Sequence, residues 1–203
     1  MGLFQQPARL VRVALAAGVV ALTALPIIVT AVIVATTGAE NISNDYIAYV
    51  GLVDRVLAGT YDWRHYFRDT FLGGSHSMAL PVLVRLAVVT LSAWSVYTEL
   101  WIVLALSLAR LVLLRAALAR LVPGRSAWVL WPVLAALVFS PSQINVFTYG
   151  DAGLQIALNQ AALALSIWGL VAFPGRWRGV CVMMLGGIAG ALSGGAGLLA
   201  WPV

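Results

Sequence analysis

The sequence predicts an all-α fold, a polytopic transmembrane helical bundle of about five spans with interfacial helices in a long first external loop. One observation behind this prediction is composition, since 62% of the 203 residues are hydrophobic and only 9% are charged. A second is the mean hydropathy of +0.97. A third is a series of apolar runs as long as a bilayer-crossing helix, roughly 20 residues each. Together these observations exclude an ordinary soluble domain.

The apolar runs place the spans in order within a single membrane domain, residues 1–203. The first run, 13–35, is uncharged and follows Arg9 and Arg12, which predicts a cytoplasmic N-terminus. A cleaved signal peptide is the alternative, but its apolar region is usually about 7–15 residues long. The later spans are expected at 96–118, 128–147, 152–173 and 179–199. The helix of the 128–147 span should end near Pro141, because proline lacks a backbone N–H donor.

The arginines agree with this orientation. The chain has no lysine, and eight of its twelve arginines fall on or near the predicted cytoplasmic side: Arg9, Arg12, Arg110, Arg115, Arg120, Arg125, Arg176 and Arg178. They are scattered singly, without the basic stripe that nucleic acid requires, so no nucleic-acid partner is expected. Arginine in place of lysine, with abundant Ala, Val, Leu and Gly, is typical of a GC-rich bacterial gene. The expected location is therefore the bacterial inner (plasma) membrane, with the first loop external.

The loop from 37 to 95 holds five of the seven acidic residues and both histidines. Its first part predicts a helix capped by Ser43 or Asn44 and stopped near Gly59. That helix should lie along the membrane on an apolar stripe formed by Tyr46, Tyr49, Val50, Val53 and Leu57.

Two further loop helices are expected. One begins at Asp62, which can cap it, and ends at a turn closed by Gly73. The other contains Arg85 near its middle. It should be interfacial or re-entrant, because inserting an arginine at mid-bilayer costs about 2.5–3.5 kcal/mol.

Asp45 is the candidate catalytic residue. It stands at the start of the first loop helix, where a carboxylate can act as a general base toward an attacking hydroxyl. Helix capping is the alternative, since the positive end of the helix dipole also favours an acid there. Arg64 and Arg68 can each hold a phosphate through paired donors. The other loop acids, Asp54, Asp62 and Asp69, are expected to be solvated charges.

No cofactor is expected, because a divalent metal lacks a supporting motif. His65 and Asp69 are four residues apart, but two histidines make a thin ligand set and no known metal-binding spacing is present. His76 lies in a glycine-containing turn, where it is predicted to position a polar headgroup, or else to be a solvated loop residue. Cys181 is expected to be a small buried hydrophobe.

Polar and small residues near the later spans suggest two further features. The polar residues at the external ends of the third and fourth spans are expected to line the same pocket as the loop: Gln143, Asn145, Asp151, Gln155 and Asn159. Gly186, Gly190 and Gly194 are spaced four apart and let another helix approach closely. Packing within the chain is expected there rather than dimerisation, and the oligomeric state is left open.

This order of parts resembles the N-terminal half of the C-type (GT-C fold) integral-membrane glycosyltransferases, including the bacterial protein-mannosyltransferase-like members. The likeness covers nearly the whole chain, from a loop that opens with Asn44, Asp45 and Tyr46, through His76 before the second span, to an ending at 197–202. Members of this superfamily usually have more spans, so the chain is expected to be the N-terminal part of a longer protein.

The resemblance implies transfer of a sugar, with inversion, from a polyprenyl-phosphate-linked donor to an unknown hydroxyl acceptor on the external face. It implies that Asp45 is the base or orients the acceptor. The residues expected to bind substrate are Tyr46, Arg64, Arg68, His76, Arg85 and Gln155.

Two other function classes remain open. One is a non-catalytic membrane subunit of the same architecture, for lipid-carrier binding, transport or assembly. An enzyme should lose turnover in Asp45→Asn while keeping carrier binding, whereas such a subunit should tolerate the change. The other is a transporter, although the sequence has neither an intramembrane ion relay nor a detectable inverted repeat.

Overall fold

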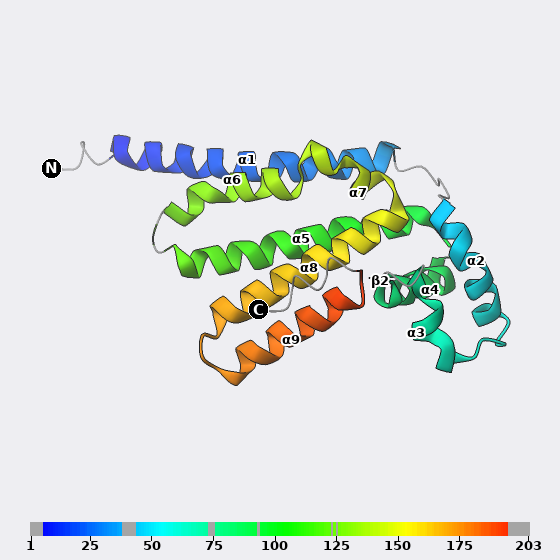
Figure 1. Ribbon diagram of the computed structural model, residues 1–203. Helices are drawn as coiled ribbons and strands as arrows, with labels where there is room; N and C mark the ends of the chain where they lie inside the picture. Colours follow the sequence, from blue (N-terminus) through cyan, green and yellow to red (C-terminus); the bar gives the residue numbers. More distant parts are fainter. Residues whose placement is uncertain are drawn as a thin grey trace.

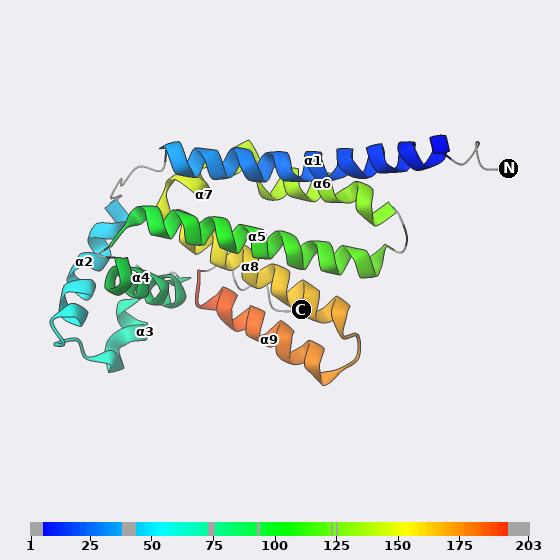
Figure 2. The same cartoon turned by 180° about the vertical axis from the view of Figure 1, so that it is seen from behind.

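Long helices lying side by side form most of the molecule (Figure 1). The computed structural model describes residues 6–37, 44–72, 76–92, 94–122, 124 and 126–194. The bundle consists of α1 (Gln6–Thr37), α5 (Val96–Leu121), α6 (Ser126–Val138), α8 (Gly150–Ala172) and α9 (Trp177–Ala191). The shorter helices α2 (Asn44–Leu57), α3 (Tyr66–Asp69) and α4 (Ala79–Ser92) gather at one end, and the view from behind in Figure 2 shows the same arrangement.

Four stretches of the bundle are long and apolar enough to cross a membrane: Leu10–Thr36, Val96–Leu121, Ala127–Thr148 and Ala152–Ala172. They indicate an integral membrane protein, and the predicted helical fold class is confirmed to that extent. The fifth predicted span begins as α9, a helix of 15 residues. The helix ends at Ala191 and the chain turns at 192–193, so it is shorter than the predicted span of 179–199. Residues 195–199 lie outside the described residues, and the count of five spans stays a prediction.

The predicted break in the third stretch is confirmed. Helix α6 ends at Val138, and a 3-10 turn, η2 (Pro141–Gln143), separates it from α7 (Ile144–Thr148). Ser140 caps η2, because its hydroxyl accepts a hydrogen bond from the Ser142 N–H at 3.2 Å. Pro141 follows as the first residue of the turn, where its missing N–H costs nothing.

Residues 44–92, here called the loop module, have a hydrophobic core of their own. The module contains α2, a 3-10 turn η1 (Trp63–His65), α3, the paired strands β1 (Phe71–Leu72) and β2 (His76–Ser77), and α4. Its buried side chains come from all three helices and the segments between them: Tyr49, Leu52, Val53, Tyr61, Tyr66, Met78, Ala79, Val82, Leu86 and Val89. A separate core in the bundle is centred on Leu100, Val103, Phe147 and Leu154.

The stripe of α2 that was expected to face the membrane is divided in the structure. Tyr49 and Val53 are buried in the module core instead, whereas Val50 is 37% exposed and Leu57 is 58% exposed. Leu52 is buried with them in that core. Both stripes satisfy helical spacing, and contact with α4 selects the one that faces the module core.

Hydrogen bonds fix the module internally and to the bundle. The buried Tyr66 hydroxyl donates to the Ala79 carbonyl at 2.5 Å, which ties α3 to α4. The Leu80 N–H donates to the Leu192 carbonyl at 2.9 Å, just beyond the end of α9, and the Leu192 side chain packs against the module core. The module is therefore held against the end of α9 as well as joined in sequence to α5.

Close approach of α8 and α9 depends on small residues. Gly186 is buried against α8, where an added Cβ would lie 2.6 Å from the Ala162 carbonyl oxygen and would also meet the Ser166 hydroxyl. Ser166 donates to the Met183 carbonyl at 3.1 Å across the same contact. In a bilayer such packing and interhelical hydrogen bonds, rather than the hydrophobic effect, hold helices together. Gly186 thus packs within the chain, as predicted.

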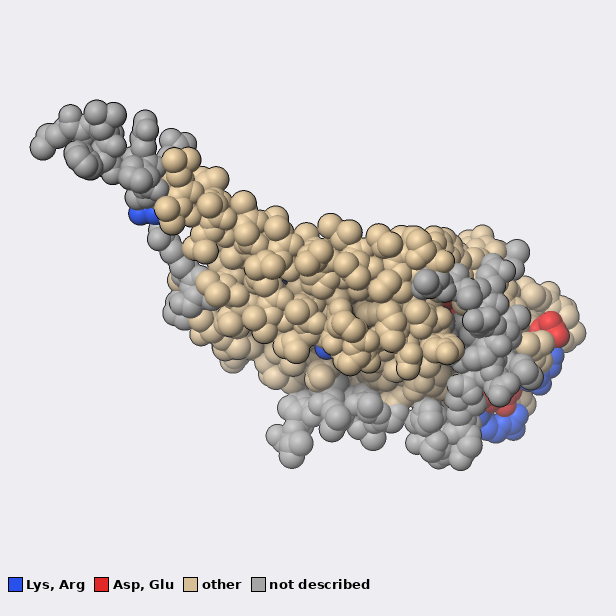
Figure 3. Space-filling view, turned by 90° about the horizontal axis from the view of Figure 1, so that it is seen from above, with Lys and Arg blue, Asp and Glu red and all other residues tan. Residues whose placement is uncertain are grey.

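Most of the described charged side chains lie toward the two ends of the molecule. Figure 3 shows red and blue atoms clustered over the loop module, whereas the middle of this face is almost entirely uncharged. Arg12, Arg120, Arg176 and Arg178 lie at the opposite end, close to the start of α1 and to the connections that join α5 to α6 and α8 to α9. That end is called the arginine end below.

Candidate functional site

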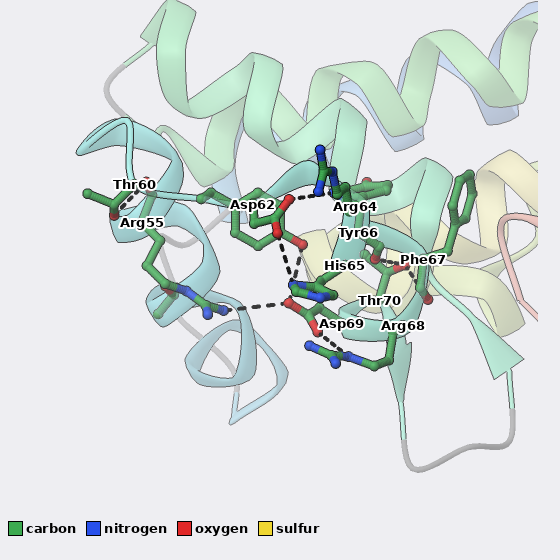
Figure 4. Close-up of polar contacts among 12 residues, drawn as sticks. Arg55, Thr60, Asp62, Arg64, His65, Tyr66, Phe67, Arg68, Asp69 and Thr70 are labelled. Atoms are coloured by element: carbon green, nitrogen blue, oxygen red, sulfur yellow. Dashed lines mark hydrogen bonds and ion pairs between the residues drawn. The ribbon is translucent and has the colours of Figure 1, made fainter.

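The candidate site lies on η1 and α3, where charged and aromatic side chains meet at the surface of the loop module (Figure 4). Asp62 caps η1, because its Oδ1 accepts a hydrogen bond from the Arg64 N–H at 3.0 Å. Its Oδ2 lies 3.6 Å from His65 Nδ1. The predicted capping by Asp62 is confirmed, and the carboxylate also lies next to the His65 ring.

Asp69 links α2 to α3. Its carboxylate accepts hydrogen bonds from Arg68 Nε at 3.1 Å and from the Tyr61 hydroxyl at 3.3 Å, and Arg55 Nη2 lies 3.8 Å away. The expectation of a solvated charge was wrong for this residue, whose side chain is only 19% exposed. Partial desolvation alone would raise the pKa of Asp69, but the hydrogen bond and charge of Arg68, with smaller effects of Tyr61 and Arg55, lower it overall.

The pKa values of the neighbouring Tyr61 and Tyr66 hydroxyls are raised, in contrast to that of Asp69. Burial raises the pKa of the Tyr61 hydroxyl, and the adjacent Asp69 carboxylate raises it further. Burial also raises the pKa of Tyr66. Both side chains therefore stay neutral hydrogen-bond donors at physiological pH.

Arg64 and Arg68 differ in what they can bind. Both side chains are exposed, and Figure 4 shows their guanidinium groups on opposite sides of Asp62 and His65. Arg68 is engaged by Asp69 through Nε. Within the described part of the chain, the Arg64 guanidinium has neither a hydrogen bond nor an ion pair. Arg64 is therefore the better placed of the two to hold a phosphate through paired donors.

Aromatic residues precede and follow Arg64 in the sequence. Trp63 contacts the rings of Tyr61 and Tyr66 at centroid distances of 5.3 and 5.6 Å, and Phe67 contacts Tyr66 at 5.8 Å. Trp63 is 54% exposed and Phe67 is 61% exposed. Exposed aromatic rings beside an arginine are typical of a surface at the level of lipid headgroups.

Arg85 lies elsewhere, in the interior between α2, α4 and α5. Its Nε is 3.3 Å from Glu99 Oε1 and 3.4 Å from Oε2, and both residues have no exposed surface. Its guanidinium carbon also lies 5.2 Å from the centre of the Tyr49 ring. The sequence analysis missed Glu99, although an acid in the first turn of an apolar helix was a usable signal. The geometry brings Arg85 to Glu99, not to Arg64.

For the remaining residues predicted to act at the site, the structure describes the backbone position of all and the side chain of only one. Asp45 and Tyr46 belong to the first turn of α2 and His76 begins β2, but their side chains lie outside the described residues. Gln155 is partly buried on α8, where its amide approaches Gly194 beyond the end of α9.

The polar pocket expected around the later spans is only partly described. Asn159 lies near Gln155 and donates through Nδ2 to the Ser193 carbonyl at 3.1 Å. Asn145 is exposed and Gln143 contacts the Leu137 carbonyl at 3.4 Å, so these two lie apart from that pair. The side chain of Asp151 lies outside the described residues. The amides of Gln155 and Asn159 thus form a small polar group at the junction of α8 and α9.

No family model, curated protein or solved structure matches the chain. In the part of the chain with described side chains, no three His, Cys, Asp or Glu residues come together as a metal site would require.

Proposed function

We propose that this protein is a membrane glycosyltransferase-like protein that binds a polyprenyl-phosphate-linked sugar at the loop module. The observation that supports this most directly is the exposed Arg64 guanidinium on a segment that also carries the exposed aromatic residues Trp63 and Phe67, at one end of an apolar bundle. A phosphate placed there meets paired donors, and the attached polyprenyl chain continues along apolar helices.

The orientation follows from the charge distribution. With the arginine end cytoplasmic, as the positive-inside rule favours, the loop module lies on the external face of a bacterial plasma membrane. In this proposal α2 and α3 lie at the level of the external headgroups, where Trp63 and Phe67 act as interfacial anchors.

The chemistry assigned to the module is one displacement at the anomeric carbon. The acceptor hydroxyl oxygen forms the new bond to that carbon while the bond to the phosphate oxygen breaks, which inverts the configuration. The leaving group is the polyprenyl phosphate, held by Arg64. The acceptor proton passes to the carboxylate of Asp45, the candidate base.

A non-catalytic carrier-binding subunit is the second candidate, and the loop acids favour it. Asp62 is occupied by capping and Asp69 by Arg68, Arg55 and Tyr61, so neither is poised to accept a proton. In such a subunit Arg64 would still bind the carrier phosphate, and Asp45 would serve only as a helix-capping residue.

Turnover separates the two candidates. The full chain in lipid vesicles is incubated with polyprenyl-phosphate-[¹⁴C]mannose and membrane extract as a source of acceptor. Release of the labelled sugar from the carrier is followed as loss of radioactivity from the lipid spot on thin-layer chromatography. The enzyme should lose release in Asp45→Asn and keep it in Asp54→Asn, a matched change at an exposed acid on the same helix. Absence of release from the wild-type chain, or equal release from Asp45→Asn, would refute the catalytic proposal.

A further inference from the structure

Two apolar cavities lie along α1 toward the arginine end, away from the candidate site. One, of about 310 Å³, is lined by α1 and α6 and includes Arg12, Val19 and Trp128. The other, of about 220 Å³, lies deeper between α1, α5 and α6 and includes Thr23, Leu108, Arg115 and Trp131. Their walls are mainly apolar side chains, which suits a hydrocarbon chain rather than water.

A stack of three side chains connects the linings of the two cavities. The Trp128 and Trp131 rings are stacked with centroids 4.7 Å apart, and each lines a different cavity. The Arg115 guanidinium carbon lies 3.5 Å from the centre of the Trp131 ring. This cation–π contact holds the guanidinium against the wall of the smaller cavity.

Several groups that line these cavities lack an anionic or hydrogen-bonding partner among the described side chains. Among the described side chains, no acid pairs with Arg12 or Arg115, and the buried Nε1 of Trp131 has no hydrogen-bond acceptor. The described acidic side chains, Asp54, Asp62, Asp69 and Glu99, all belong to the loop module or the adjoining start of α5, at the opposite end of the bundle. An anion with a long apolar chain would supply the negative charge and the hydrogen-bond acceptor that these groups lack, and its chain would fill the apolar cavities.

We infer that these cavities bind an anionic phospholipid, with its headgroup between Arg12 and Arg115 and one acyl chain running beside Thr23 and Leu108. Arginines and a Trp N–H at a membrane boundary are the donors that phosphate and ester oxygens accept from. A lipid fits this site better than free phosphate does, because free phosphate would leave the apolar cavities unfilled. This site is independent of the one proposed for the carrier.

Native mass spectrometry of the full chain in detergent tests the inference directly. Dioleoyl phosphatidylglycerol and dioleoyl phosphatidylcholine, which share their acyl chains, are titrated against the wild type, Arg115→Gln and Arg176→Gln. Loss of one charge-assisted contact should weaken phosphatidylglycerol binding about tenfold in Arg115→Gln. Arg176→Gln, at the same end but outside both cavities, should bind as the wild type does.

A second variant covers the case in which Arg115→Gln does not fold. Ala16→Trp keeps every arginine but fills the larger cavity, so it should bind either lipid less tightly while melting as the wild type does. Equal wild-type affinity for both lipids would overturn the inference, as would unchanged phosphatidylglycerol binding in the folded variants.

Discussion

Arg85 and Glu99 form an ion pair that is fully enclosed where the loop module meets α5, with Nε 3.3 Å from Oε1. The pair links two helices that are joined only by the short segment between Ser92 and Val96. Enclosed charges are costly to take out of water, so each residue needs the other.

Removal of one partner should therefore destabilise the protein more than removal of both. Glu99→Ala leaves the Arg85 charge enclosed and should cost about 3–5 kcal/mol of unfolding free energy. The double variant Arg85→Met with Glu99→Leu replaces the pair by apolar side chains and should recover most of that loss. Thermal melting in detergent measures both, and a Glu99→Ala protein as stable as the wild type would show that the pair has no structural role.

This pair also shows where the sequence analysis reached its limit. Hydropathy located the long helices, and Pro141 located a break, because both are local signals. The contact of Arg85 with Glu99 is tertiary, and no periodic pattern in the sequence predicts it. The buried face of α2 was ambiguous for a similar reason, since two apolar stripes share Tyr49 and Val53. Cys181 was expected to be buried but is exposed, because α9 turns that side outward.

Asp69 should make the stability of the loop module depend on acid pH. Because the folded-state pKa of Asp69 lies below its ordinary value of 3.8, its contribution is present above that value and is lost as the pH falls through the lowered pKa. The difference in melting temperature between the wild type and Asp69→Asn should be clear at about pH 6 and should shrink at about pH 2.5. A difference that grows on acidification would contradict the assigned contacts.

Gly186 should be intolerant of a side chain. Gly186→Leu forces a Cβ against the Ala162 carbonyl and should cost about 1–3 kcal/mol through overpacking of α8 and α9. Gly18→Leu is the matched control, because an added Cβ there meets nothing within 4 Å. Melting curves of the two variants should differ, and equal stability would mean that α8 and α9 do not approach as closely as described.

The orientation of the bundle can be tested with single cysteines, since Cys181 is the only native one. In a Cys181→Ser background, Thr60→Cys on the loop module should react with a membrane-impermeant maleimide in intact spheroplasts. Arg178→Cys at the arginine end should react only after permeabilisation. The reverse pattern would place the loop module in the cytoplasm and remove the basis for an external donor.

Binding of the carrier is the claim on which both candidate functions depend. The full chain in vesicles is irradiated with a diazirine-tagged polyprenyl phosphate, and the labelled peptides are identified by mass spectrometry. Labelling should fall on the loop module and require about tenfold more carrier in Arg64→Gln, with Arg178→Gln as the control. Labelling that avoids the module, or that is the same in all three proteins, would contradict the proposed carrier site.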